Sequence, residues 1–284
     1  MFSTINYFVQ SVLIYFFFLI AIIFRLKISR KIFSLLFSIV GPFFKSKRIL
    51  NNNLNLFSKN ISEHSKKKIE KNMWRNYGMT FIEYMFLNYF KKQNSHIDIK
   101  GEEILYLKEN NKPVIFVSGH FANFELMSME IVKKNIKLAT IYRPLNNIFL
   151  NPLMEYLRRK YVCKNQIKKG INGVRDAIQY IKDNYSIALM IDQRVSEGEK
   201  INFFGKPAHT TTLPAQLSKK YNLDIIPVYI ERINEGKFQI EFQNIIKPEN
   251  FKDKIELSEK LNKVLEKMIE RNPGQWIWTH NRWK

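Results

Sequence analysis

A histidine and a glutamate, His120 and Glu125, lie five positions apart in the segment 117–125 (VSGHFANFE), directly after an apolar run. On one continuous helix, side chains five positions apart point about 140° away from each other. They can meet only if His120 lies in a strand-to-helix loop and Glu125 lies in the first helical turn. There the carboxylate would orient the imidazole, and the free ring nitrogen could take a proton from an attacking hydroxyl. The same spacing fits an ordinary loop histidine, so spacing alone leaves both interpretations open.

Such a loop needs a strand before it and a helix after it, and the chain beyond Gly101 repeats this alternation. Runs rich in β-branched and apolar residues occur at 113–117, 138–142, 186–191 and 225–230, with helix-like segments near 123–134, 147–161, 171–183 and 212–221. This order predicts an α/β fold with a central, mostly parallel sheet flanked by helices. Asp192 ends one apolar run, where α/β proteins often place functional groups, although we slightly favour a structural role.

Residues 7–24 form an almost unbroken apolar run of about 18 residues, long enough for a transmembrane helix. No basic segment precedes the run and no small-residue cleavage site follows it, so we expect a retained anchor. Arg25, Lys27 and Arg30 follow at once, and this positive charge predicts a single-pass anchor with the remaining chain on the cytoplasmic face. A buried core helix is the weaker alternative, because the run has no polar face.

The next segments are typical of a region that docks on the membrane. Residues 32–44 are rich in Phe, Leu and Ile and are followed by basic residues, which predicts an interfacial amphipathic element. The pattern turns helical over 62–90. We therefore divide the chain into a transmembrane anchor (1–30), an interfacial and amphipathic helical region (31–100) and an α/β domain (101–284).

The composition supports one sizeable folded domain and limits its partners. The chain has 284 residues, of which 45% are hydrophobic and 14% aromatic, so disorder is not expected outside short loops. The net charge of +21 predicts attraction to polyanions, although an AT-rich genome would also favour lysine, isoleucine and asparagine. Cys163 is the single cysteine, which excludes an internal disulfide, and without a nearby histidine we expect no nucleophilic role.

The segment 119–125 (GHFANFE) resembles the His-x4-Asp/Glu block of the lipid A late acyltransferases, whose usual form is GHFGNWE. Further blocks that resemble this family follow in the same order: YRPL at 142–145, DQR at 192–194, FFGKPA at 203–208 with TTT at 210–212, and PGQWIWTHNRWK at 273–284. The resemblance runs from the N-terminal apolar run to the last residue. Five ordered blocks are poorly explained by chance.

The resemblance implies a fold like that of glycerolipid acyltransferases and transfer of a fatty acyl chain from acyl carrier protein to a hydroxyl of a lipid A precursor. It places this activity at the bacterial inner membrane and requires no cofactor. It makes His120 the general base and Glu125 its orienting partner. The blocks also give the candidate substrate-binding residues Asn123, Arg143, Asp192 and Arg194. A guanidinium suits an oxyanion or phosphate contact, although surface arginines look the same in sequence.

Two residues depart from the usual family form. Ala122 replaces a common Gly, which would hinder a positive φ, and Phe124 replaces Trp. The same chemistry on an ornithine lipid, a glycolipid or a glycerolipid stays open. A non-catalytic, membrane-tethered polyanion-binding protein is the rival class, but no nucleic-acid motif supports it and we expect no nucleic acid as partner. The His-x4-Glu spacing also lacks the i, i+4 histidine pair of a helical zinc site, so we expect no metal.

Overall fold

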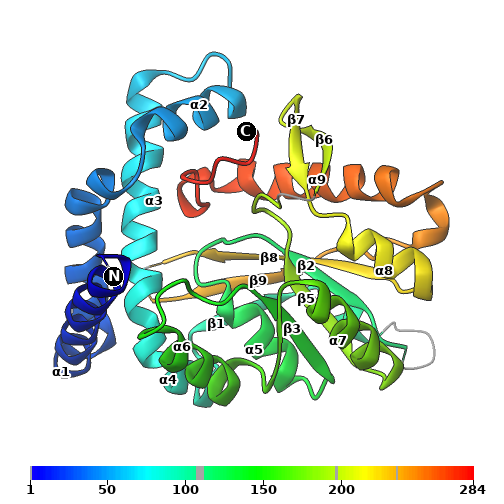
Figure 1. Cartoon of the computed structure of the whole chain (residues 1–284), viewed down its shortest axis with the longest axis horizontal. Helices are drawn as coiled ribbons and strands as arrows, with labels where there is room; N and C mark the ends of the chain where they lie inside the picture. Colours follow the sequence, from blue (N-terminus) through cyan, green and yellow to red (C-terminus); the bar gives the residue numbers. More distant parts are fainter. Residues whose placement is uncertain (1, 107–111, 196–197, 235) are drawn as a thin grey trace.

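A computed structural model describes residues 2–106, 112–195, 198–234 and 236–284. Its centre is a seven-stranded sheet in the order β1-β9-β8-β2-β5-β3-β4, accompanied by a separate β6-β7 hairpin (Figure 1). The strands are β1 (Ile97–Lys100), β2 (Ile115–Ser118), β3 (Leu138–Tyr142), β4 (Asn165–Lys168), β5 (Ser186–Met190), β6 (Glu199–Phe203), β7 (Lys206–Thr210), β8 (Ile225–Arg232) and β9 (Phe238–Phe242). Within the large sheet only β8 and β9 pair antiparallel, so the predicted α/β fold with a mostly parallel sheet is confirmed.

Helices cover both faces of the sheet. They are α1 (Phe2–Phe44), α2 (Lys47–Phe57), α3 (Glu63–Glu83), α4 (Leu87–Lys92), α5 (Glu125–Lys133), α6 (Asn151–Leu157), α7 (Ile171–Lys182), α8 (Leu213–Tyr221) and α9 (Lys254–Arg271). Short 3-10 turns are η1 (Tyr84–Phe86), η2 (Glu102–Leu105), η5 (Pro248–Asn250) and η6 (Pro273–Gln275), and η4 (Arg158–Val162) is a π-helical turn. Because parallel crossovers are right-handed, α5 and α6 lie on one face, and α7 and α8 lie on the other.

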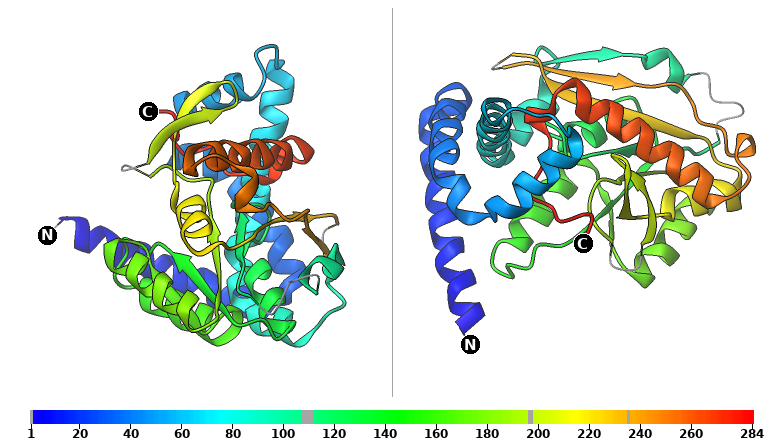
Figure 2. Two further views of the ribbon diagram at one scale, coloured as in Figure 1. Left: turned by 90° about the vertical axis from the view of Figure 1, so that its right-hand side faces the viewer. Right: turned by 90° about the horizontal axis from the view of Figure 1, so that it is seen from above.

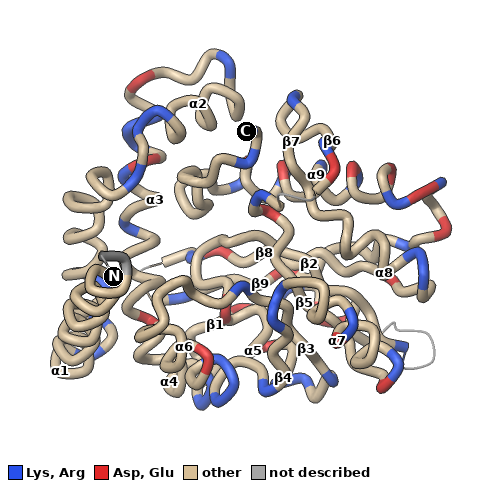
Figure 3. The backbone as a smooth tube through the Cα atoms, in the orientation of Figure 1, with Lys and Arg blue, Asp and Glu red and all other residues tan. Residues whose placement is uncertain are grey.

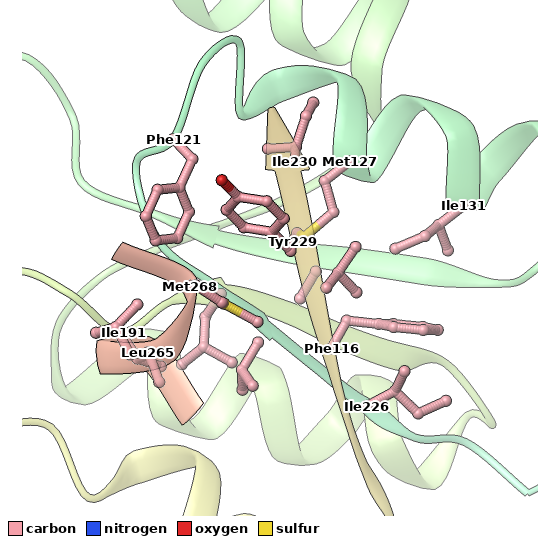
Figure 4. Close-up of a cluster of buried hydrophobic side chains, with 14 of the residues drawn as sticks. Phe116, Phe121, Met127, Ile131, Ile191, Ile226, Tyr229, Ile230, Leu265 and Met268 are labelled. Carbon is pink, nitrogen blue, oxygen red and sulfur yellow. The ribbon is translucent and has the colours of Figure 1, made fainter. Parts of the chain in front are cut away.

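The core lies between these layers. Every residue of β2 is buried, as expected for a central strand with both faces covered. Figure 4 shows side chains of α5 and α9 packing against β2 and β8, with the rings of Phe121 and Tyr229 in edge contact at 5.3 Å. Phe121 belongs to the loop after β2, so this contact fixes the loop to the core.

The first helix is long, apolar and broken once. Arg25 has φ 58° and ψ 168°, which interrupts α1 and turns its second half onto α3 (Figures 1 and 2). Among the described residues, one helix is apolar enough to cross a membrane, over Thr4–Phe44, with a mean hydropathy of 2.4 and 17% of its most apolar stretch buried. That low burial disfavours the alternative of a core helix. Gly78 permits the close packing, because a Cβ there would lie 2.2 Å from the carbonyl oxygen of Phe33.

The N-terminal half of α1 also contacts the loop between β3 and α6. The hydroxyl of Ser11 donates to Asn147 Oδ1 at 2.9 Å, and Asn147 Nδ2 donates to the carbonyl of Tyr7 at 2.9 Å. Tyr15 donates through its hydroxyl to the carbonyl of Phe149 at 2.8 Å. The loop between β3 and α6 is therefore joined to successive turns of this helix.

Candidate active site

His120 lies where the parallel strands β2 and β5 end side by side. Ser118, the last residue of β2, is in register with Met190, the last residue of β5. Residues two positions beyond each strand end are therefore neighbours, and these are His120 and Asp192. The Nδ1–H of His120 donates to Asp192 Oδ1 at 2.7 Å, and the backbone N–H of His120 donates to Oδ2 at 2.7 Å.

Asp192 is buried and is held by neutral donors in addition to the imidazole. The indole N–H of Trp276 donates to its Oδ2 at 2.9 Å. Burial alone would raise the pKa of Asp192, but the charge and hydrogen bonds of His120, together with the bond from Trp276, hold it below its usual range. The carboxylate therefore stays ionised and fixes the imidazole tautomer that leaves Nε2 free to accept a proton.

The imidazole is enclosed on its other sides. The ring of Phe124 contacts it edge-on at 4.6 Å, and Gln193 Nε2 lies 3.3 Å from His120 Nε2. The His120 side chain keeps 17% of its surface exposed, on the side of the cavity described below. This arrangement can accept a proton from a hydroxyl that enters the cavity.

Glu125 does not have the role that its spacing suggested. Its Oε1 accepts from the Tyr84 hydroxyl and from Arg158 Nη2 at 2.7 Å and Nε at 2.8 Å. The prediction that Glu125 orients His120 is therefore wrong in its geometry. Glu125 starts α5 and its carboxylate bonds Tyr84 of η1 and Arg158 of η4, whereas the imidazole of His120 bonds Asp192, just beyond the end of β5.

The other predicted substrate-binding residues separate into two groups. Arg143 is exposed and lines the cavity. Asn123 and Asp192 are buried and outside the cavity lining, because their side chains bond Glu83 and His120 instead. Arg194 is exposed and is also absent from the lining, which contains its neighbour Gln193. Of the four residues, Arg143 alone belongs to the lining of the described cavity. A substrate-binding role for each of the four stays a prediction.

A cavity of about 750 Å³ opens beside His120. Its lining includes the apolar side chains of Ile14 and Phe18 of α1 with Phe81, Met127 and Met154. It also includes the polar side chains of Lys45, Arg143, Gln193 and His280. Such a volume is typical of a site for a small molecule or a lipid chain. The lining therefore offers His120 both apolar surface suited to a hydrocarbon chain and polar groups suited to an anionic or hydroxylated group.

Several residues that complete the site were not indicated by any motif in the sequence. Gln193 was visible only as the middle residue of the DQR block, and nothing in its spacing indicated contact with His120. Glu83 and Thr80 carried a usable signal, because they are polar residues one turn apart in an otherwise apolar stretch of helix. The aromatic C-terminal segment, noted in the sequence only as the last block of the resemblance, contributes Trp276 and Trp278 to the core, where they are 2% and 0% exposed.

A family model for bacterial lipid A biosynthesis acyltransferases matches this chain over residues 1–284. The chain belongs to this family. A lipid A biosynthesis acyltransferase of Haemophilus influenzae is 24% identical over 244 residues, covering 83% of this chain and 76% of the relative. The lipid A biosynthesis palmitoleoyltransferase of Escherichia coli K12 is 26% identical over 257 residues, covering 86% and 80%. The lauroyltransferase of the same organism is 22% identical over 247 residues, covering 84% and 78%.

Among solved structures, the chain is similar to the 1-acyl-sn-glycerophosphate acyltransferase PlsC from Thermotoga maritima, with a TM-score of 0.44 and 16% identity. That match covers 89% of this chain and 100% of the other. The membership of the lipid A acyltransferase family identifies this protein as an acyltransferase. Its long N-terminal helix is apolar.

Proposed function

We propose that the protein transfers a fatty acyl chain from an acyl carrier protein thioester to a hydroxyl of a lipid A precursor, with His120 as general base. The observation that carries this proposal is the carboxylate–imidazole pair of Asp192 and His120 beside a cavity lined by both apolar and polar side chains. The family supplies the class of acceptor. The geometry supplies the group that activates it.

In the proposed reaction, Nε2 of His120 takes the proton of the acceptor hydroxyl while its oxygen attacks the thioester carbonyl carbon. The imidazolium that forms is stabilised by the Asp192 carboxylate. Collapse of the tetrahedral intermediate breaks the carbon–sulfur bond, and the leaving thiolate takes the proton back from Nε2. The ester, the free thiol and the neutral imidazole account for all atoms and charges.

The cavity supports a division between chain and headgroup. Apolar lining residues such as Phe18 and Met154 are suited to the acyl chain, and burial of each methylene contributes about 0.8 kcal/mol. Arg143 is proposed to contact the oxyanion or a phosphate of the acceptor, because its guanidinium carries forked donors and a permanent charge. In this proposal the reacting carbonyl lies close to His120.

We further propose that the protein is held at the bacterial inner membrane by α1, with the catalytic domain on the cytoplasmic face. The outward side of α1 is a row of exposed apolar residues that includes Phe8, Val12, Phe16 and Ile23. Figure 3 shows Lys and Arg gathered on α2 and the start of α3, close to the end of α1. Basic residues beside an apolar helix favour the cytoplasmic leaflet and an acidic partner.

The test compares extracted lipids by mass spectrometry from cells that lack the gene and carry wild type, His120→Ala or His64→Ala. His64 is exposed and serves as the matched control. We expect lipid A to lack one secondary acyl chain without the gene and with His120→Ala, and to regain it with wild type and His64→Ala. Loss of an acyl group from another lipid would show that this lipid is the acceptor, and the proposed acyl transfer by His120 would still hold. Full complementation by His120→Ala would refute the proposed general base.

A further inference from the structure

Helix α3 presents a polar stripe to the loop that carries His120. Asn76, Thr80 and Glu83 are spaced four and three positions apart, so they share one face of the helix. All three are buried, and Glu83 has 0% of its surface exposed. A buried carboxylate in a helix costs free energy unless it is paired and hydrogen-bonded, so its partners require an explanation.

Glu83 is the centre of a group that we call the Glu83 cluster: Glu83, Arg30, Arg232 and Asn123. Arg30 donates through Nε to Glu83 Oε1 at 2.6 Å, and Arg232 donates at 2.6 Å to Oε1 and at 3.1 Å to Oε2. Asn123 Nδ2 donates to Oε2 at 2.9 Å. The four residues come from α1, α3, β8 and the loop after β2, so one carboxylate joins four separate segments.

The loop that follows His120 is fixed at three points. The Thr80 hydroxyl donates to the carbonyl of Ala122 at 2.8 Å, and the N–H of Ala122 donates to the carbonyl of Gln275 at 3.2 Å. Asn123 supplies the third point through Glu83. Ala122 has φ 42°, a left-handed conformation that costs a residue with a Cβ about 1 kcal/mol or more. The surrounding contacts must therefore hold the loop in this shape.

We propose that Glu83 is a positioning residue that sets the place of His120 through Asn123, and that Arg30 makes this placement depend on the docking of α1. The inference rests on the proposed acyl transfer and adds to it a link between the N-terminal helix and the reacting imidazole. Glu83 and Arg30 touch neither cavity nor imidazole. They act by holding the loop against α3, so that His120 meets Asp192 in register.

The position of Arg30 explains why the link includes α1. It follows the break at Arg25 and lies on the half of the helix that packs against α3. Its guanidinium lies 5.5 Å from the ring centre of Phe90 and 5.6 Å from that of Phe238. Removing this cation leaves Glu83 with Arg232 as its remaining ionic partner in the cluster. The balance of a buried network depends on every member.

The experiment measures kcat and KM of the full-length enzyme in detergent micelles for Glu83→Gln, Asn123→Ala and the double variant. We expect Glu83→Gln to lower kcat about 100-fold with KM changed less than about twofold, because a loop shift near 1 Å misplaces the base without removing substrate contacts. The double variant should lose no more activity than Glu83→Gln alone, because both changes break the same contact between Glu83 and Asn123. Losses that multiply, or a change in KM alone, would overturn the proposal.

The role of α1 is tested with Arg30→Met, Arg30→Lys and the control Lys27→Met, which removes an exposed cation from the same helix. We expect Arg30→Met to lower kcat about 10-fold, Arg30→Lys to recover part of the loss and Lys27→Met to match wild type. Equal behaviour of Arg30→Met and Lys27→Met would contradict the dependence on α1. Flotation with liposomes checks that all three variants still bind membranes.

A readout without substrate separates this inference from the proposed function. Diethyl pyrocarbonate modifies neutral imidazole nitrogens, and peptide mass spectrometry gives the modification rate of His120. We expect the rate to rise in Glu83→Gln and in Asn123→Ala, as the loop leaves Asp192. If the wild type showed no acyl transfer but the modification rate of His120 still rose in the variants, the proposed function would be refuted and the positioning role would stand. Asn123→Ala removes no charge, so it keeps the test usable even if Glu83→Gln does not fold. An unchanged modification rate of His120 in Asn123→Ala would refute the positioning role.

Discussion

Asp192 and Glu125 are both buried carboxylates close to the His120 loop, yet they are held in different ways. Glu125 is paired with the guanidinium of Arg158 and accepts from Tyr84. Asp192 accepts from an imidazole, a backbone N–H and an indole, and within the described residues it has no Lys or Arg at salt-bridge distance. The charge of Glu125 is therefore already neutralised, whereas that of Asp192 remains to stabilise an imidazolium.

Different parts of the fold position the two carboxylates. Asp192 meets His120 because β2 and β5 are parallel neighbours in register, so their ends coincide. Glu125 meets Arg158 because α5 and the π-helical turn η4 pack together. The carboxyl ends of the central strands β2 and β5 position the proposed reacting pair, and contacts between helices support the wall of the cavity.

The largest expected effect comes from Asp192→Asn. Neutralising the carboxylate that fixes a catalytic imidazole lowers kcat by about 10⁴-fold, because the amide favours the wrong tautomer and cannot stabilise the imidazolium. Single-turnover acyl transfer should be measured beside Asp183→Asn, an exposed control. If Asp192→Asn kept activity within tenfold of wild type, Asp192 would not differ from Glu125 in supporting the imidazolium.

Glu125→Gln should act mainly on stability. Removing one partner of a buried ion pair costs about 3–5 kcal/mol, since Arg158 keeps its charge without compensation. Urea unfolding in detergent measures this loss, and we expect kcat of the folded fraction to fall about tenfold at most. If kcat instead fell as far as in Asp192→Asn while stability held, Glu125 would be the partner of His120 that the sequence indicated.

The Glu83 cluster predicts a pH dependence of stability. Burial alone would raise the pKa of Glu83, but Arg232 and Arg30 hold it below its usual value. A depressed pKa contributes stability above the unfolded value of about 4.3, and this contribution is lost as pH falls through the folded value. The difference in unfolding free energy between wild type and Glu83→Gln should therefore shrink below pH about 4.3, by about 1.4 kcal/mol per unit of pKa depression. A difference that grows on acidification would contradict the pairing.

The smallest effect is expected for Ala122→Gly. Ala122 has a positive φ, and glycine adopts this conformation without the Cβ penalty. The gain is offset by the greater freedom of glycine in the unfolded chain, so we expect unfolding free energy to change by less than about 1 kcal/mol and activity to persist. Thermal unfolding with an acyl-transfer assay checks both. A large loss of activity would show that the loop needs the Cβ to keep His120 on Asp192.

The sequence predicted the central strands well because they are short apolar runs between helical segments. It did not indicate β1 and β4, whose half-buried alternation at the sheet edges is weak. His120 lies in the strand-to-helix loop that the sequence predicted, and its role as general base stays a prediction. Its contact with Asp192 depends on strand order, which no local pattern encodes. Arg158 was missed because its partner lies 33 positions away on another helix. The division at residues 30 and 100 stays a prediction.

The contacts of α1 mean that the proposed membrane anchor is not a modular part of this enzyme. Ser11 and Tyr15 bond the loop before α6, and Ile14 and Phe18 form part of the cavity wall. An unrelated apolar helix of equal length would keep the membrane affinity but leave a gap where these side chains stand. If α1 anchors the protein and the cavity binds the acyl chain, as proposed, these two parts must change together. Exchanging α1 between relatives is then expected to alter chain-length preference as well as location.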